Sequence, residues 1–121
     1  MGRVLLLEDN PELSDVLREV IGLAGHQVRV AQNGREGLDI LLDISRAPDI
    51  VICDLVMPDM DGFAFIRQMR ANPAWNDIYC IAMSGAKHEA KMALEAGADQ
   101  YLVKPFSIGD LSDLLDDWMS K

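Results

Sequence analysis

The alternation of short apolar runs with amphipathic helical patterns is the feature that most limits the folds open to this chain. Each apolar run predicts a buried strand, and the segments between them space their apolar residues as helices do. The predicted strands are 4–7, 27–31, 50–53, 78–83 and 101–103. The predicted helices are 11–24, 34–46, a segment around Phe65 that ends near Asn72, 87–96, and a last helix that follows Ser107.

This order of elements predicts an α/β fold with a doubly wound, five-stranded parallel sheet, because each parallel connection needs a crossover helix. The expected strand order is 2-1-3-4-5, as in the flavodoxin-like three-layer (βα)5 arrangement. At 121 residues and 50% hydrophobic content, the chain has the size of one ordinary domain. We therefore expect residues 1–121 to form a single domain.

Charge and hydropathy exclude several classes of function. The net charge is -9, so nucleic acid and anionic membranes would repel the chain, and we expect no direct contact with either. No apolar run approaches the roughly 18 residues that span a bilayer. The apolar run near the amino terminus is too short for a signal peptide. These features predict a cytoplasmic protein. Cys53 and Cys80 lie in apolar runs without metal-ligand spacing, and we expect both to be reduced core residues.

The ends of the predicted helices carry recognisable capping residues. Asn10 and Pro11 predict an N-cap and a first helical residue. Ser107 and Asp110 have the spacing of a capping box for the last helix, and Gly97 is a plausible stop for the fourth.

Asp54 is the first candidate functional residue, because a buried strand runs directly into its carboxylate and a loop with Pro58 and Gly62 follows. An aspartate often caps a turn, so the assignment depends on what else lies near it. In a doubly wound sheet, ligands bind beyond the carboxyl ends of the strands, where the strand order reverses.

The residues that follow four of the predicted strands are polar or charged. They are Glu8 and Asp9, then Asp54, Ser84 and Lys104. The second strand, at the sheet edge, is followed by no ionisable residue. This contrast favours one shared site over a general tendency of strands to end in polar residues.

Three carboxylates at one site require compensating positive charge. Two of them about 4 Å apart repel by roughly 4 kcal/mol at an effective dielectric of 20. Lys104 supplies one charge, and an all-oxygen pocket suits Mg²⁺. We expect Asp9, Asp54 and the Val56 backbone carbonyl to bind the metal, with Glu8 acting mainly through water. Asp54 would then be the nucleophile in phosphoryl transfer, assisted by Lys104, with the Ser84 hydroxyl donating to a phosphoryl oxygen.

Four segments of the chain together resemble a known family. Glu8 with Asp9, Asp54 with 57–62, 82–86, and 104–106 resemble the receiver domain of two-component response regulators, over essentially the whole chain. The resemblance implies that Asp54 accepts a phosphoryl group from a histidine kinase or histidine phosphotransfer protein with Mg²⁺. Ser84 and Tyr101 would then move together and reshape the face of the fourth helix, fifth strand and fifth helix.

The resemblance also bounds the kind of activity and the partners. It implies a signalling phosphoacceptor that assists its own phosphorylation and dephosphorylation, and not an enzyme in the ordinary sense. An effector domain or protein could bind the switching face, and a homodimer stays open. The acidic last helix argues against one charge-paired dimer used in the family. The residues do not identify the cognate kinase, the signal or an output domain.

Several residues have simpler interpretations. Tyr101 could be only a half-buried aromatic residue of an edge strand, and Lys104 only a surface lysine. Asp59 and Asp61 are expected to be loop and cap residues. His26 and His88 are expected to face solvent. The family also suggests a cis bond before Pro105, although cis is the minority state of X-Pro bonds.

Two positions depart from common family patterns. Val56 and Ala86, two residues after Asp54 and Ser84, carry no polar side chain that could orient an attacking water. We therefore expect slow spontaneous dephosphorylation.

Three alternatives belong to other classes. A flavodoxin-like module would need a glycine-rich and hydroxyl-rich loop after the first strand. A haloacid-dehalogenase-like phosphatase would need an acid where Val56 stands. The third is a receiver-like interaction scaffold that signals without phosphorylation.

Overall fold

The computed structural model describes residues 2–43, 46–57 and 60–119. Five parallel strands form one sheet in the order β2-β1-β3-β4-β5, which confirms the predicted fold class and strand order. The strands are β1 Arg3–Leu7, β2 Gln27–Ala31, β3 Ile50–Asp54, β4 Tyr79–Ser84 and β5 Gln100–Val103. The helices are α1 Pro11–Leu23, α2 Gly34–Asp43, α3 Gly62–Ala71, α4 Ala90–Ala96 and α5 Ile108–Met119. Two short 3₁₀ turns are η1 Pro73–Trp75 and η2 Lys87–Glu89.

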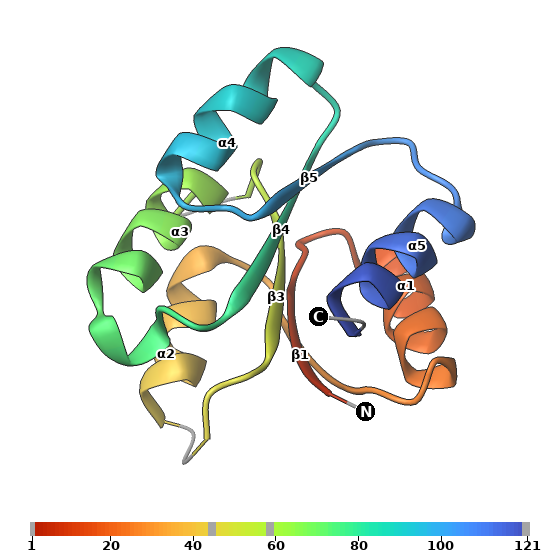
Figure 1. The fold of residues 1–121 in the computed structure, drawn as a ribbon, viewed down its shortest axis with the longest axis horizontal. Coiled ribbons are helices and arrows are strands. Elements are labelled where there is room, and N and C mark those ends of the chain that lie inside the picture. Colours follow the sequence, from red (N-terminus) through yellow and green to blue (C-terminus); the bar gives the residue numbers. More distant parts are fainter. Residues whose placement is uncertain (1, 44–45, 58–59, 120–121) are drawn as a thin grey trace.

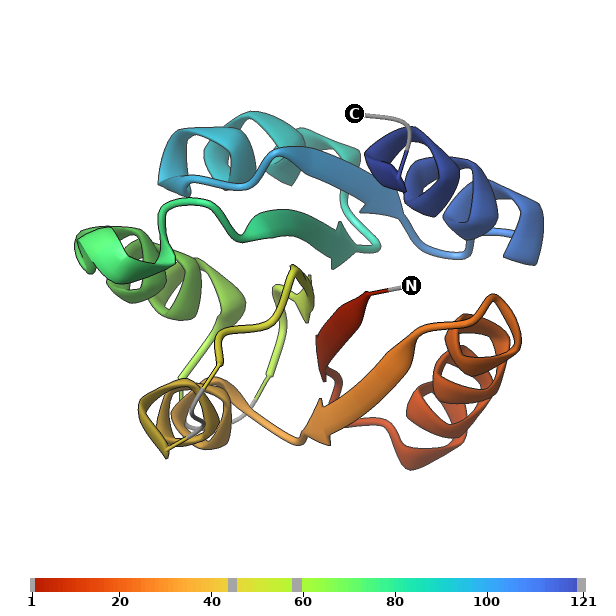
Figure 2. The same cartoon turned by 60° about the horizontal axis from the view of Figure 1, so that its bottom comes forward.

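Helices cover both faces of the sheet (Figure 1, Figure 2). On one face, α2, α3 and α4 pack over a core that includes Leu5, Val51 and Phe65. On the other face, α1 and α5 pack over a core that includes Leu6 and Ile52. Successive side chains of a strand point to opposite faces, so a strand in the middle of the sheet needs apolar residues on both.

The central strand β3 is the driest part of the sheet. All five of its residues are buried, and β1 and β4 flank it. The edge strands β2 and β5 keep several half-buried or exposed residues. Asp54 is therefore attached to a strand that is fixed by neighbours on both sides and on both faces.

The predicted helix caps are present. The Asn10 Oδ1 atom accepts hydrogen bonds from the amides of Glu12 at 3.0 Å and Leu13 at 3.2 Å. Ser107 and Asp110 exchange the two side chain to backbone bonds of a capping box, at 3.0 and 3.1 Å. Gly97 has a φ of 125° and follows α4 directly, as a glycine stop can.

Two predicted helices differ in extent from the structure. The predicted helix 34–46 ends at Asp43, and its residues 44–45 lie outside the described residues. The predicted helix 87–96 is divided into η2 and the seven-residue α4. Neither piece has a side-chain hydrogen bond at its N-cap.

The prediction that His26 faces solvent is wrong. His26 is 5% exposed, and its Nδ1 atom accepts a hydrogen bond from the Gly2 amide at 3.0 Å. Its ring lies against Trp118 of α5, with 5.9 Å between ring centroids. The end of α5 thus covers the amino ends of β1 and β2, a long-range contact that local sequence does not reveal. His88 is exposed, as predicted.

Both cysteines are buried free thiols, as predicted. Burial raises the pKa of the Cys80 thiol to about 12 and raises that of Cys53 well above its ordinary value. None of the helices that the structure describes is long and apolar enough to cross a bilayer.

An arginine network closes the amino ends of β4 and β5. Arg70 of α3 donates to the carbonyls of Gly97, Trp75 and Asn76 at 2.9 to 3.2 Å, and to Asp99 at 3.0 Å. Asp99 also accepts the Cys80 amide at 2.8 Å. The network ties the end of α3 to the turn between α4 and β5.

Candidate functional site

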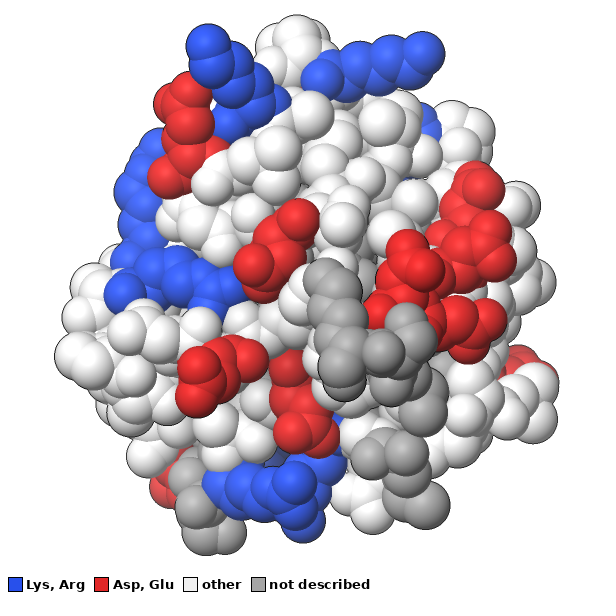
Figure 3. Space-filling model, in the orientation of Figure 1, with Lys and Arg blue, Asp and Glu red and all other residues white. Residues whose placement is uncertain are grey.

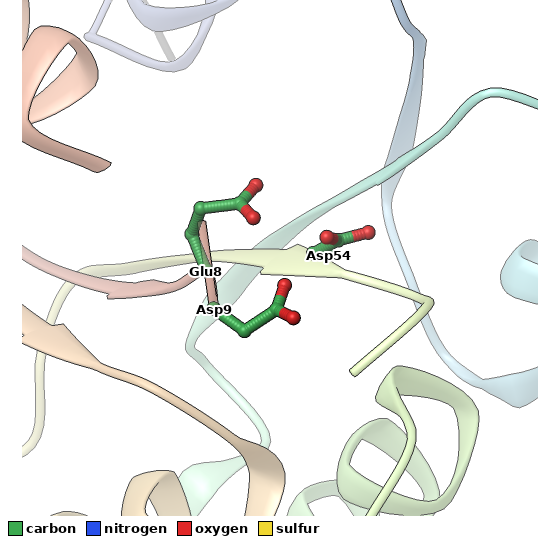
Figure 4. Close-up of side chains that lie close together, drawn as sticks. All are labelled: Glu8, Asp9 and Asp54. Carbon is green, nitrogen blue, oxygen red and sulfur yellow. The ribbon is translucent and has the colours of Figure 1, made fainter. Parts of the chain in front are cut away.

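Three carboxylates meet at the carboxyl ends of β1 and β3. These strands are neighbours in register, with Leu7 opposite Cys53, so the residues that end them lie side by side. Glu8, Asp9 and Asp54 each place a carboxylate oxygen within 4.8 Å of the others. In Figure 4 the side chains of Glu8 and Asp9 point towards Asp54. The three acids that the sequence predicts at one site therefore lie together.

Lys104 joins two of these acids. Its Nζ atom lies 2.9 Å from Glu8 Oε1 and 3.1 Å from Asp54 Oδ2. The side chains of Glu8, Asp54 and Lys104 are 1%, 7% and 24% exposed, so these ion pairs are shielded from water far more than surface pairs are. The lysine comes directly after β5 and is paired with acids, not an ordinary surface lysine. The Lys104–Pro105 bond is cis, as the family resemblance suggested.

Burial and pairing act on the pKa of both partners. Burial raises the pKa of Glu8, and the hydrogen bond from Lys104 offsets only part of that effect. Burial alone would lower the pKa of Lys104, but its bond to Glu8 and the charge of Asp54 outweigh it and raise the pKa. The ammonium form of Lys104 is thus the form that the site favours.

The site carries more negative than positive charge. Glu8 uses both oxygens, because its Oε2 atom also accepts the Asn10 amide at 3.1 Å. Asp9 is exposed, and in the described part of the chain its side chain has no hydrogen bond or ion pair. The carboxylate oxygens of the three acids are hard ligands, and that of Asp9 has no partner. Such a set of ligands suits Mg²⁺.

The loop after β3 fixes the Asp54 carboxylate from the other side. The Val56 amide donates to Asp54 Oδ1 at 3.1 Å, while the Val56 side chain is 67% exposed. A Cβ at Gly62 would collide with the Asp54 carbonyl oxygen, so only glycine permits the loop to return this closely. Asp61 caps α3 by accepting the Ala64 amide at 2.8 Å, as predicted. Pro58 and Asp59 lie outside the described residues.

Ser84 ends β4, the strand on the other side of Asp54. The residue opposite Asp54 is Met83, so Ser84 lies one position further along, and it is buried. Its hydroxyl donates to the Glu89 carboxylate of η2 and accepts the Ala86 amide at 3.2 Å. The half-buried Tyr101 of β5 donates its hydroxyl to the Ala86 carbonyl. Ser84 and Tyr101 therefore contact the same short segment.

Glu89 is a residue that sequence reasoning missed. It ends a run of three consecutive polar residues between two alanines, and such a segment predicts a solvated helix end. Side chains five residues apart do not face each other in a regular helix, so the spacing of Glu89 from Ser84 predicts no contact. Only the 3₁₀ turn, which sequence did not predict, brings the two side chains together.

The doubly wound sheet with acids and a lysine at its carboxyl end defines a chemotaxis-regulator-like fold. The family model described as "Response regulator receiver domain" matches residues 4–116. The chain therefore belongs to the response regulator receiver domain family.

Two curated relatives are regulatory proteins. The KDP operon transcriptional regulatory protein KdpE of Escherichia coli K12 is 40% identical over 113 residues, which cover 92% of this chain and 48% of KdpE. Response regulator MprA of Mycolicibacterium vanbaalenii is 36% identical over 109 residues, which cover 90% of this chain and 46% of MprA. This chain spans about half the length of these relatives.

Solved structures show the same fold. The signal receiver domain of a histidine kinase from Syntrophus aciditrophicus has a TM-score of 0.89 and 30% identity, covering 99% of this chain and 91% of that chain. The receiver domain of sensor histidine kinase PA1611 from Pseudomonas aeruginosa PAO1 has a TM-score of 0.88 and 25% identity, covering 99% and 98%. The latter is described with a magnesium ion coordinated in its active site cleft.

Proposed function

We propose that this chain is a phosphorelay receiver in which Asp54 accepts a phosphoryl group from a histidine kinase or a histidine phosphotransfer protein. The observation that carries the proposal is the placement of Asp54. Its carboxylate lies at the rim of a buried strand, bonded to Lys104 on one oxygen and to the Val56 amide on the other. A nucleophile held on both sides needs little reorientation to attack.

The chemical step needs one nucleophile and several groups that neutralise charge. An Asp54 oxygen forms the new bond to phosphorus, and the bond between phosphorus and the donor imidazole nitrogen breaks. Lys104 faces the site and offsets the negative charge of the transferring group. Ser84, at the end of the adjacent strand, would donate a hydrogen bond from its hydroxyl to a phosphoryl oxygen.

Mg²⁺ is the cofactor that fits the residues present. Asp9, Asp54 and the Val56 backbone carbonyl would hold the ion, with Glu8 acting mainly through water. When bound, Mg²⁺ supplies positive charge that three carboxylates and one lysine lack. Without it, a further dianionic group would enter a site that is already negative.

The output of the site would pass through Ser84 and Tyr101 to the face of α4, β5 and α5. This face would bind an effector domain, an effector protein or a second copy of the chain. The net charge of -9 speaks against direct binding of nucleic acid. On the face shown in Figure 3, acidic groups gather most densely at the right, while lysines and arginines lie along the upper left edge, at the top and at the bottom.

A phosphotransfer experiment tests the proposal. We expect acetyl phosphate with Mg²⁺ to add one phosphoryl group to the protein, observed by intact mass, and we expect Asp54→Asn to abolish the addition. Chelation of the metal should also abolish it. A wild-type protein that never acquires the group, although it is folded and Mg²⁺ is present, would contradict the proposal and favour the interaction scaffold.

The phosphorylated form should decay slowly. Val56 and Ala86 offer no polar side chain to the attacking water, so the chain would assist its own dephosphorylation only weakly. The measurement is the lifetime of the Asp54 phosphoryl group in Mg²⁺ without a phosphatase. Val56→Asn should shorten it, and an equal lifetime in both proteins would contradict this expectation.

A further inference from the structure

The Ser84 hydroxyl already uses its one hydrogen-bond donor in the structure. Its oxygen accepts the Ala86 amide, and its single proton is donated to the Glu89 carboxylate. A hydroxyl has one proton to donate. Ser84 therefore cannot donate to a phosphoryl oxygen and to Glu89 at the same time.

Glu89 has no competing partner for its side chain. It is half-buried, and within the described ranges no lysine or arginine side chain lies within ion-pair distance of it, Lys87 and Lys91 included. Its backbone amide donates to the Ala86 carbonyl at 3.1 Å, the same oxygen that receives the Tyr101 hydroxyl. Glu89 thus links the Ser84 hydroxyl, η2 and Tyr101 in one small network.

The start of this helical segment has no other side-chain support. Neither η2 nor α4 has a side-chain N-cap. The side-chain hydrogen bonds that hold the segment 84–89 are Ser84 to Glu89, the Ala86 amide to Ser84, and Tyr101 to the Ala86 carbonyl. Loss of the first frees the carboxylate to turn outward, because Glu89 is not enclosed.

We infer that Glu89 is a positioning residue that holds Ser84 in the unphosphorylated protein, and that a phosphoryl group on Asp54 must displace it. This inference rests on the proposed function. A carboxylate and a phosphoryl oxygen are both charged acceptors, so they compete for the same proton. The competition opposes activation, and it connects release of Ser84 directly to release of η2 and of the Ala86 carbonyl that Tyr101 contacts.

The first test uses the protein without any phosphodonor. Glu89→Gln keeps the size of the side chain and removes its charge, so the bond to Ser84 weakens. We expect amide hydrogen exchange at Ala86 and Glu89 to become about tenfold faster, as expected when a bond to a charged group is weakened. Glu95→Gln, an exposed charge change on α4, is the matched control and should leave both rates unchanged.

A double-mutant cycle tests whether Glu89 acts through Ser84. Ser84→Ala should accelerate exchange of the Glu89 amide by about the same factor, and adding Glu89→Gln to it should produce no further change. Additive effects in the double variant would overturn the inference, as would unchanged exchange in Glu89→Gln.

The second test asks whether the bond opposes the phosphoryl group. Beryllium fluoride with Mg²⁺ serves as the phosphoryl analogue. With fluoride in excess, we expect Glu89→Gln to be half-saturated at about a tenfold lower beryllium concentration than wild type, because the competing acceptor is weakened. A purely structural Glu89 would leave this concentration unchanged or raise it, and either result would overturn the inference.

The outcomes separate this inference from the proposed function. Acetyl phosphate could modify wild-type Asp54 while Glu89→Gln changes neither amide hydrogen exchange nor the affinity for beryllium fluoride. In that case the proposed function stands and the role of Glu89 is refuted. If wild type never accepts a phosphoryl group, the proposed function fails, and a competition with that group is refuted with it, whatever the exchange rates show.

Discussion

The two ends of the sheet both gather charged groups, but they arrange them differently. At the amino end, Arg70 donates to three carbonyls and one carboxylate, and Asp99 accepts both Arg70 and an amide. At the carboxyl end, Lys104 faces two buried acids, and Asp9 is added without a partner.

The difference separates structural charge from functional charge. The amino-end network has one cation, one acid and satisfied donors, so nothing need be added to it. The carboxyl-end cluster has three acids and one cation, and such an imbalance costs folding free energy unless a ligand relieves it. Unbalanced charge, more than the gathering of charge as such, therefore marks the site.

The largest expected effect comes from removing the cation of the functional end. Lys104→Met should reduce the initial rate of Asp54 modification by acetyl phosphate about 100-fold or more, because one donor to the developing charge is lost. Intact mass against time gives the rate. Lys91→Met, an exposed lysine of α4, is the control. Equal rates for the Lys104 variant and wild type would remove Lys104 from the proposed chemistry.

The matching change at the amino end should affect stability and not phosphorylation. Arg70→Met removes the hydrogen bonds to Asp99 and to three carbonyls, and we expect the free energy of unfolding to fall by about 2 kcal/mol. Urea unfolding measures it. Arg67→Met, on the exposed side of the same helix, should change it by about 0.5 kcal/mol or less. A clear loss of phosphorylation rate in folded Arg70→Met would break the proposed division between the ends.

A smaller effect, on Mg²⁺ binding, is expected from replacing Asp9, the acid without a partner. Asp9→Asn should weaken Mg²⁺ binding by about tenfold while slightly raising stability in the absence of metal, since one repulsive charge is removed. Calorimetric titration and thermal unfolding give the two quantities. Asp15→Asn, whose carboxylate pairs with Arg18 on α1, serves as control. A fall in metal-free stability would show that Asp9 is not repelled.

The smallest effect concerns His26 at the amino end. Burial lowers the pKa of His26 below its ordinary 6.5, so the fold favours the neutral ring. Its contribution to stability is complete above pH 6.5 and is lost as the pH falls from 6.5 towards the lowered value. Wild type should therefore lose stability relative to His26→Gln on acidification, measured by urea unfolding at several pH values. A difference that is independent of pH would contradict this.

The sheet, the strand order and the main site residues could be predicted because each rests on a local pattern. Short apolar runs gave the strands, and topology then placed Glu8, Asp9, Asp54 and Lys104 at one end. Asn10 and Ser107 could be assigned as caps because capping depends on neighbours two or three residues away.

The rest depends on contacts that no local pattern encodes. The burial of His26 requires the end of α5 to lie over Gly2, although Trp118 is far away in sequence. The bond from Ser84 to Glu89 requires a 3₁₀ turn where the sequence favours a continuous helix. The Arg70 network similarly joins residues up to 29 positions apart.

The buried central strand determines which parts of the protein could change structure when a group is attached to Asp54. β3 is enclosed by two strands and two helical layers, so nothing beneath the aspartate has room to yield. A structural change that follows modification of Asp54 would therefore occur in the loops at the carboxyl end of the sheet, which only a few side-chain hydrogen bonds hold in place. Because the strand below is rigid, such a change would alter the surface of the protein, where a partner could bind.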